Sequence, residues 1–133
     1  MKKIENLAVR YRPKRLADLL GNKQVKRALR AYLQKGAFPK STLIYGPTGS
    51  GKTTLARIAA KALNCQNPDN GFNPCEKCYS CTSSLEWHGS IWEINCTVRR
   101  KLDDMRQAIQ VSLLYPLHKC RVLILDEVQG ASH

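Results

Sequence analysis

The feature that most constrains the fold is a glycine-rich stretch that begins at Gly46 and reads GPTGSGKT through Thr53. It fits the pattern G-x-x-x-x-G-K-[ST], in which a loop joins a strand to the first turn of a helix. An apolar run at 43–45 precedes the loop, and residues 51–64 carry apolar side chains at helical spacing. We therefore predict a first strand over 42–45, a phosphate-binding loop, and a helix over 51–64.

The residue types of this loop suit nucleotide chemistry. Glycines let successive backbone N–H groups turn toward phosphates at the positive end of a helix. Lys52 is expected to reach the β- and γ-phosphates of ATP, and the hydroxyl of Thr53 is expected to hold Mg²⁺. A chance glycine-rich turn is the alternative, and the order of strand, loop and helix argues against it. The predicted nucleotide-binding residues are Gly46, Pro47, Thr48, Gly49, Ser50, Gly51, Lys52, Thr53 and Thr54.

Two carboxylates near the end of the chain are the natural partners of this loop. Asp126 and Glu127 directly follow the apolar run 122–125. At the carboxyl edge of a parallel sheet, Asp126 can reach the Mg²⁺ and Glu127 can polarise a water for attack on the γ-phosphate. We predict Lys52, Asp126 and Glu127 as catalytic residues, and Thr53 with Asp126 as the magnesium ligands. A solvated strand end is the alternative.

The rest of the chain alternates helix and strand patterns. Helical periodicity marks 22–36, with Asn22 placed to cap the helix and Gly36 to end it. Residues 7–21 contain Pro13 and read as an irregular arm. After a short helix that ends near Trp87 and His88, strands over 90–94 and 121–125 flank a helix over about 102–114. This alternation predicts an α/β fold with a parallel sheet and crossover helices.

Four of the six cysteines are clustered, at Cys65, Cys75, Cys78 and Cys81. Two consecutive Cys-x2-Cys steps and one more distant cysteine supply four thiolates, which suits a tetrahedral, structural zinc site without an open position. The zinc would fix the turn-rich loop 66–74, which we expect to be an inserted loop outside the core. Free surface thiols and a redox pair are the alternatives. Cys96 and Cys120 lie outside this spacing and are expected to be small core residues.

Charge and composition restrict the setting. The chain of 133 residues allows one domain, or a piece of a larger one. It contains no candidate signal or membrane segment, so we expect a cytoplasmic protein with no membrane partner. The net charge is +12, and residues 1–40 hold 12 of the 22 basic side chains but only 2 of the 10 acidic ones. This asymmetry favours a nucleic-acid partner over a solvated basic face. The cluster Arg99, Arg100 and Lys101 fits phosphate contact and a solvated charge cluster equally well.

Several motifs occur in fixed order along the chain: LAVRYRP from Leu7, GPTGSGKTTLARIAAKALNC from Gly46, the four cysteines, Glu93-Ile94, DDMR from Asp103, and LDEV from Leu125. Together they resemble the ATPase subunits of bacterial DNA polymerase III clamp loaders, the gamma/tau subunits of the AAA+ family. The likeness covers nearly the whole chain, and the cysteine insertion directly after the loop helix is specific among AAA+ proteins.

The resemblance implies a three-layer αβα P-loop fold and an ATP-driven motor. Such a motor works with other clamp-loader subunits to open a ring-shaped sliding clamp and place it on primed DNA. In that family the positions of Ala8, Arg12, Pro13 and Leu20 lie by the adenine, and those of Arg99 and Lys101 lie toward the DNA backbone. The chain would then be the N-terminal part of an AAA+ domain, with residues 1–21 as an adenine-side arm and 65–81 as a zinc-binding insertion.

The family sheet also implies what this chain lacks. Its strand order is 5-1-4-3-2, so the strand between the loop strand and the Asp126 strand would come after His133. We therefore expect a truncated sheet and a fragment of a longer polypeptide. Two other functions remain open: a truncated or divergent homologue that binds nucleotide, DNA or a partner without turnover, and a different zinc-bearing P-loop motor acting on nucleic acid.

Overall fold

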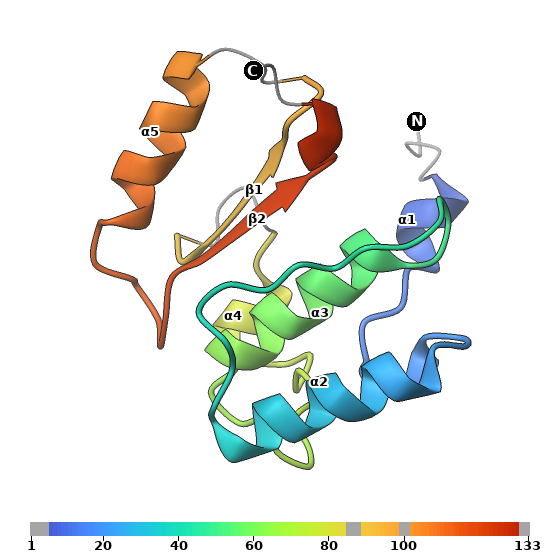
Figure 1. The fold of residues 1–133 in the computed structure, drawn as a ribbon. Coiled ribbons are helices and arrows are strands. Elements are labelled where there is room, and N and C mark those ends of the chain that lie inside the picture. Colours follow the sequence, from blue (N-terminus) through green and yellow to red (C-terminus); the bar gives the residue numbers. More distant parts are fainter. Residues whose placement is uncertain (1–5, 85–88, 99–101, 131–133) are drawn as a thin grey trace, which may run out of the picture.

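The computed structural model describes residues 6–84, 89–98 and 102–130 (Figure 1). Within these ranges, helices dominate the N-terminal two thirds and a small sheet lies in the C-terminal third. The helices are α1 (Leu7–Arg10), the 3-10 helix η1 (Leu16–Asp18), α2 (Lys23–Lys35), α3 (Lys52–Asn64), α4 (Tyr79–Thr82), α5 (Leu102–Ser112) and the 3-10 helix η2 (Val128–Gly130). The strands are β1 (Ile91–Asn95) and β2 (Val122–Asp126). None of the helices described is long and apolar enough to cross a bilayer.

The sheet is a parallel pair. β1 and β2 run in register from Ile91 beside Val122 to Asn95 beside Asp126, and α5 forms the crossover between them. The predicted parallel sheet with a crossover helix is thus confirmed for these two strands. Their register brings Asn95 and Asp126 together at the carboxyl edge, where the predicted acidic residues lie.

Helices cover both faces of this pair (Figure 1). On one face Ala60 of α3 packs with Ile91 and Ile124. On the other face Ala108 of α5 packs with Ile94 and the fully buried Cys96. Because side chains alternate between the faces of a strand, this division follows from the sequence order of the apolar residues. The result is a layer of helix on each side of the strands. Cys120, the other cysteine expected in the core, is only partly buried.

Helix α2 forms a further layer on the outer side of α3. Its Leu29 belongs to a buried cluster with Leu16 of η1 and with Leu55 and Ile58 of α3. Gly36 ends α2 as predicted, with a left-handed φ of 62° that favours glycine. Asn22 occupies the N-cap position, but its side chain makes no capping hydrogen bond. Its amide instead donates to the backbone carbonyl of Ser50 at 3.3 Å.

The predicted first strand over 42–45 is wrong. Residues 42–46 have no regular secondary structure, and Figure 1 draws them as a loop. Leu43 and Tyr45 are 80% and 87% exposed, while Ile44 packs against the cluster around Leu29. An extended segment becomes a strand only when a neighbour supplies backbone hydrogen bonds. Among the residues described, β1 and β2 pair only with each other, so this segment has no such neighbour.

The inserted loop also differs from expectation, because part of it is core. Phe72 packs against the cluster around Leu29, and Asn73 and Pro74 are buried. The guanidinium of Arg30 lies 4.7 Å from the centre of the Phe72 ring. Phe72 is the one large apolar side chain in a segment that is otherwise made of turn formers, and α2 covers it.

In the C-terminal third, α5 ends at Ser112, close to the predicted boundary. Two residues of its predicted apolar face, Ile109 and Leu113, are 58% and 80% exposed. The helix expected before Trp87 is the single turn α4, and Trp87 and His88 lie outside the described residues.

Candidate nucleotide site and cysteine cluster

The glycine-rich loop leads directly into the first turn of α3. Gly49 and Gly51 have φ angles of 77° and 85°, in the region that residues with a Cβ rarely adopt. Gly51 is the N-cap of α3, and its carbonyl accepts a hydrogen bond from Leu55 N at 2.8 Å. The loop thus curls over the positive end of a 13-residue helix, which is a geometry that attracts anions.

Lys52 lies across this loop. Its Nζ donates to the carbonyl of Gly46 at 2.9 Å and to that of Pro47 at 2.8 Å. The ammonium is therefore held directly over the curl formed by the glycines. An anion that enters the curl meets this charge and the N–H groups of the first helical turn together.

Thr53 and Asp126 meet although they are 73 residues apart in the chain. The Thr53 hydroxyl donates to an Asp126 carboxylate oxygen at 2.9 Å, in a partly buried position. Two neighbouring ligands of an octahedral Mg²⁺, each about 2.1 Å from the metal, lie about 3 Å apart. The two oxygens are thus spaced as neighbouring magnesium ligands are.

Glu127 follows Asp126 in a strained conformation. Its φ is 55°, which is uncommon for a residue with a side chain. Its backbone N–H donates to Asp126 Oδ1 at 3.0 Å, and its exposed carboxylate accepts a hydrogen bond from Gln129. Strain of this kind persists only where surrounding structure supports it, and it concentrates at functional sites.

A pocket of about 110 Å³ adjoins the loop. Leu19, Leu20 and Asn22 form one wall, and Tyr45, Gly46 and Lys52 lie on the loop side. Leu20 was predicted to lie by the adenine, and it lines this pocket. Arg12 and Pro13, predicted for the same role, line a separate pocket of about 280 Å³ together with Glu76. Ala8 lies in α1, and nothing is described of its side chain.

The sequence analysis did not predict an ion pair that lies beside the site. Arg57 of α3 donates from Nε and Nη2 to the two oxygens of Glu93 on β1, at 2.6 and 2.5 Å. The side chains are only 28% and 17% exposed. The hydrogen bond with Glu93 raises the pKa of Arg57, burial opposes this, and the charges of Glu93 and Asp126 add to it. A carboxylate inside the apolar strand pattern at 91–94 was the signal that a cationic partner had to exist.

The four clustered cysteines converge. Their Sγ atoms all lie within 4.8 Å of one another. The Cys75–Cys81 and Cys65–Cys78 sulfur pairs are 3.9 and 4.0 Å apart. Four thiolates about 2.3 Å from one tetrahedral zinc lie about 3.8 Å from each other. The donor set and its spacing therefore fit zinc.

Backbone groups around the cluster favour thiolates. N–H groups of Lys77 and Cys78 lower the pKa of the Cys75 thiol to about 6, and Cys78 N donates to Cys75 Sγ at 3.3 Å. Burial raises the pKa of Cys81. Two ammonium groups adjoin the cluster, because Lys61 Nζ donates to the Cys81 carbonyl at 2.8 Å and Lys119 Nζ donates to the Cys65 carbonyl.

Comparison with known proteins places this sequence in a family. A model of the family described as "DNA polymerase III, delta subunit" matches residues 21–129, which include the loop, the cysteine cluster and both acidic residues. The chain belongs to this family.

Curated relatives of this DNA polymerase III family member carry related names. DNA polymerase III subunit gamma of Buchnera aphidicola subsp. Baizongia pistaciae is 32% identical over 128 residues, which are 95% of this chain and 34% of that protein. DNA polymerase III subunit gamma/tau of Mycobacterium tuberculosis is 37% identical over 123 residues, 89% of this chain and 21% of that protein. The resemblance to gamma/tau subunits is therefore confirmed.

The family likeness also reaches a plant protein. Protein STICHEL-like 2 of Arabidopsis thaliana is 30% identical over 126 residues, 93% of this chain and 15% of that protein. The chain thus spans about a third or less of the length of these relatives.

The structure does not describe the residues that we predicted to contact DNA. Arg99 and Lys101, with Arg100 between them, lie outside the described residues. The loop immediately before them is described: Asn95, at the end of β1, accepts a hydrogen bond from Thr97 N at 2.9 Å. This contact starts the connection to α5 directly beside the carboxyl edge where Asp126 lies.

Proposed function

We propose that this chain is the ATP-binding and ATP-hydrolysing part of a DNA polymerase III clamp-loader subunit, acting in the cytoplasm. The observation that carries the proposal is the 2.9 Å contact between Thr53 and Asp126 beside the glycine-rich loop. A P-loop motor needs a hydroxyl from the loop and a carboxylate from a distant strand at one point, and this contact supplies both. The similarity to gamma and gamma/tau subunits supplies the biological setting.

Each residue has a distinct task in this proposal. Backbone N–H groups of the loop from Gly46 to Thr54, except at Pro47, surround the phosphates of ATP, and the Lys52 ammonium binds the β- and γ-phosphates. Thr53 and Asp126 hold Mg²⁺, which neutralises charge that develops on the phosphates. Glu127 orients a water in line with the γ-phosphate and accepts its proton. Leu20, which lines the pocket beside the loop, is assigned to the adenine side, and Ala8, Arg12 and Pro13 of the arm are assigned there by the family resemblance alone.

The cysteine cluster has a structural role in this proposal. Cys65, Cys75, Cys78 and Cys81 bind one Zn²⁺ with all four tetrahedral positions filled by protein, so no position is left for substrate. The zinc fixes the insertion 65–81 within the N-terminal part of an AAA+ domain. The partners proposed are the other clamp-loader subunits, the sliding clamp and primed DNA, with Arg99 and Lys101 directed to the DNA backbone.

The proposal is tested by the ATPase activity of the full polypeptide with and without primed DNA and sliding clamp. We expect stimulation by DNA and clamp together. Glu127→Gln should leave ATP binding intact and reduce turnover about a hundredfold or more, because it removes the general base. ATP binding by the parent chain without turnover would favour a binding module. An ATPase rate that rises with DNA but does not change when the sliding clamp is added would favour a different nucleic-acid motor.

A further inference from the structure

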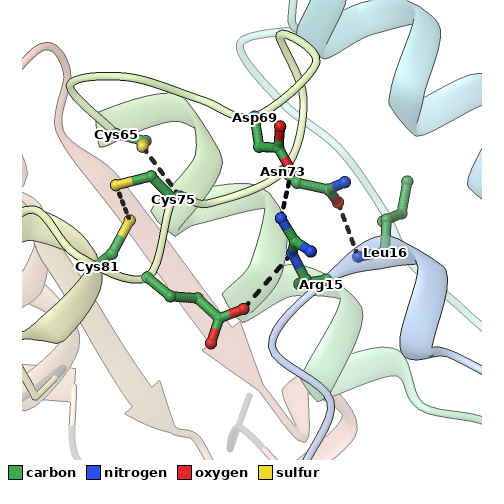
Figure 2. A network of polar contacts seen from close by, with 8 residues as sticks. Arg15, Leu16, Cys65, Asp69, Asn73, Cys75 and Cys81 are labelled. Atoms are coloured by element: carbon green, nitrogen blue, oxygen red, sulfur yellow. Dashed lines mark hydrogen bonds and ion pairs between the residues drawn. The ribbon is translucent and has the colours of Figure 1, made fainter.

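Arg15 joins the N-terminal arm to the cysteine insertion (Figure 2). Its guanidinium forms an ion pair with Asp69 and a second one, at 3.5 Å, with Glu76. Both acids belong to the loop that carries the cysteines. The next residue adds a backbone contact, because Leu16 N donates to Asn73 Oδ1 at 3.1 Å in a buried position.

The same stretch of arm reaches the nucleotide pocket a few residues later. We call residues 15–22 the arm segment. Its Leu19, Leu20 and Asn22 line the pocket beside the glycine-rich loop. Asn22 Nδ2 donates to the Ser50 carbonyl at 3.3 Å. One end of the arm segment is thus held by the insertion, and the other end forms a wall of the pocket.

The middle of the arm segment is fixed by packing. Leu16 is only 3% exposed and belongs to the buried cluster that contains Leu55, in the first turns of α3. Leu19 packs against this cluster, and so does Phe72 of the insertion. Lys26 Nζ donates to the Leu19 carbonyl at 2.7 Å. The arm segment thus contacts the insertion at Arg15 and Leu16, the buried cluster at Leu16 and Leu19, and the pocket at Leu20 and Asn22.

We propose that Arg15 is a positioning residue that couples the cysteine cluster to the nucleotide pocket, by fixing the arm segment against the insertion. Glu76 lies between the predicted ligands Cys75 and Cys78, and Asp69 lies in the loop between Cys65 and Cys75, so zinc binding at these cysteines restricts where both carboxylates lie. Zn²⁺ binding then fixes the pocket wall, and ATP binding in turn favours the zinc-bound loop, because coupling between two sites is reciprocal. This inference rests on the proposed nucleotide site.

The first test measures the Kd for Mg-ATP of the zinc-loaded full chain. Arg15→Met should raise the Kd about fivefold, which is the effect expected from partly exposed ion pairs. Arg15→Lys keeps the charge and should restore most of the affinity. Arg106→Met is the matched control: it removes an exposed pair with Asp103 on α5, across the sheet, and should leave the Kd unchanged.

A second pair of variants leaves the arm untouched. Asp69→Asn combined with Glu76→Gln removes the partners of Arg15 and should raise the Kd for ATP by a similar factor. This combination keeps the test decisive if Arg15→Met fails to fold, which the thermal unfolding curve and the zinc content of each variant would reveal.

The decisive test compares the ATP affinity of zinc-loaded and zinc-free protein. Parent chain stripped of Zn²⁺ should bind ATP about fivefold more weakly than the loaded chain, and saturating Mg-ATP should tighten Zn²⁺ binding by the same factor. In Arg15→Met the removal of zinc should cause no further loss of ATP affinity. If Arg15 only stabilised the fold, the loss of ATP affinity from zinc removal and the loss from Arg15→Met would be additive.

The outcomes separate this inference from the proposed function. If the parent binds ATP, Lys52→Ala does not, and Arg15→Met binds with the parent's affinity, the coupling is wrong and the nucleotide site stands. Additive losses from zinc removal and Arg15→Met also overturn the coupling. Failure of the zinc-loaded parent to bind ATP overturns the nucleotide site, and the coupling with it.

Discussion

Thr53 and Asp126 show which distant residues the sequence could place next to each other. Both were predicted as magnesium ligands, and the structure brings their oxygens to 2.9 Å. The prediction was possible because the loop motif and the apolar strand with its terminal acids are each contiguous in the chain. Arg57 and Glu93 could not be paired in this way, since a helix-to-strand contact across 36 residues leaves no spacing rule.

The Arg57–Glu93 pair yields a stability prediction. Arg57→Met leaves the Glu93 carboxylate, only 17% exposed, without its bidentate partner and should lower the free energy of unfolding by about 3 kcal/mol. Arg57→Met combined with Glu93→Gln should recover part of this loss. Denaturant unfolding of the single and double variants measures the coupling energy.

The control for that experiment is the exposed pair of Arg106 and Asp103, whose side chains are 68% and 89% exposed. Arg106→Met should change stability by less than about 0.5 kcal/mol. Equal effects of Arg57→Met and Arg106→Met would show that the buried pair contributes no more than a surface contact.

Lys52 is expected to contribute directly to ATP affinity. Lys52→Ala should weaken ATP binding at least tenfold, because a charge-assisted bond to phosphate contributes about 1.5–3 kcal/mol. Lys40→Ala, an exposed lysine outside the loop, is the control and should bind normally. Calorimetric titration with ATP measures both, and retained affinity in Lys52→Ala would refute the loop assignment.

At the scale of elements, periodicity predicted α2 and α3 well, because an amphipathic helix carries its own pattern. It failed at 42–45, where the residues are apolar but a strand needs a hydrogen-bonding neighbour. It also failed in the insertion, where a single aromatic residue, Phe72, supplies a core contact that turn-forming composition conceals. Local composition therefore indicates whether a segment is apolar or turn-forming. Its secondary structure and burial depend on the neighbouring strands and core side chains that it contacts.

The insertion is expected to depend on zinc for its structure. The protein should contain about one zinc ion per chain, and Cys78→Ser with Cys81→Ser should lose it. Without zinc, amide hydrogens of residues 66–82 should exchange much faster. Those of β1, β2 and α5 should keep their protection, because their contacts do not involve the cluster. Hydrogen exchange with mass spectrometry measures this, and a metal-free chain with a protected insertion would contradict it.

At the scale of the whole molecule, the net charge of +12 led us to expect a polyanionic partner, and the structure shows that some of the cations make internal contacts. On α2, Lys26 binds the Leu19 carbonyl and Arg30 lies over Phe72. The basic face of that helix is thus partly committed to internal contacts. The DNA contact that the family resemblance implies lies at Arg99 and Lys101, outside the described residues.

Salt dependence tests that expectation. Arg99→Ala with Lys101→Ala should reduce the slope of log affinity for primed DNA against log salt by roughly 1.4 to 1.8, because each phosphate contact contributes about 0.7 to 0.9. Lys40→Ala with Arg106→Ala removes the same charge elsewhere and should have a smaller effect. Equal slopes for the two double variants would show that only net charge matters.

The central claim is that the glycine-rich loop and Asp126 form one magnesium-nucleotide site. The most direct test is the ratio of ATP affinities with and without Mg²⁺ in the parent chain, Thr53→Val and Asp126→Asn. We predict that Mg²⁺ tightens ATP binding at least tenfold in the parent and less than about threefold in either variant, since each removes one oxygen ligand or its charge. An unchanged magnesium effect in both variants would contradict the claim.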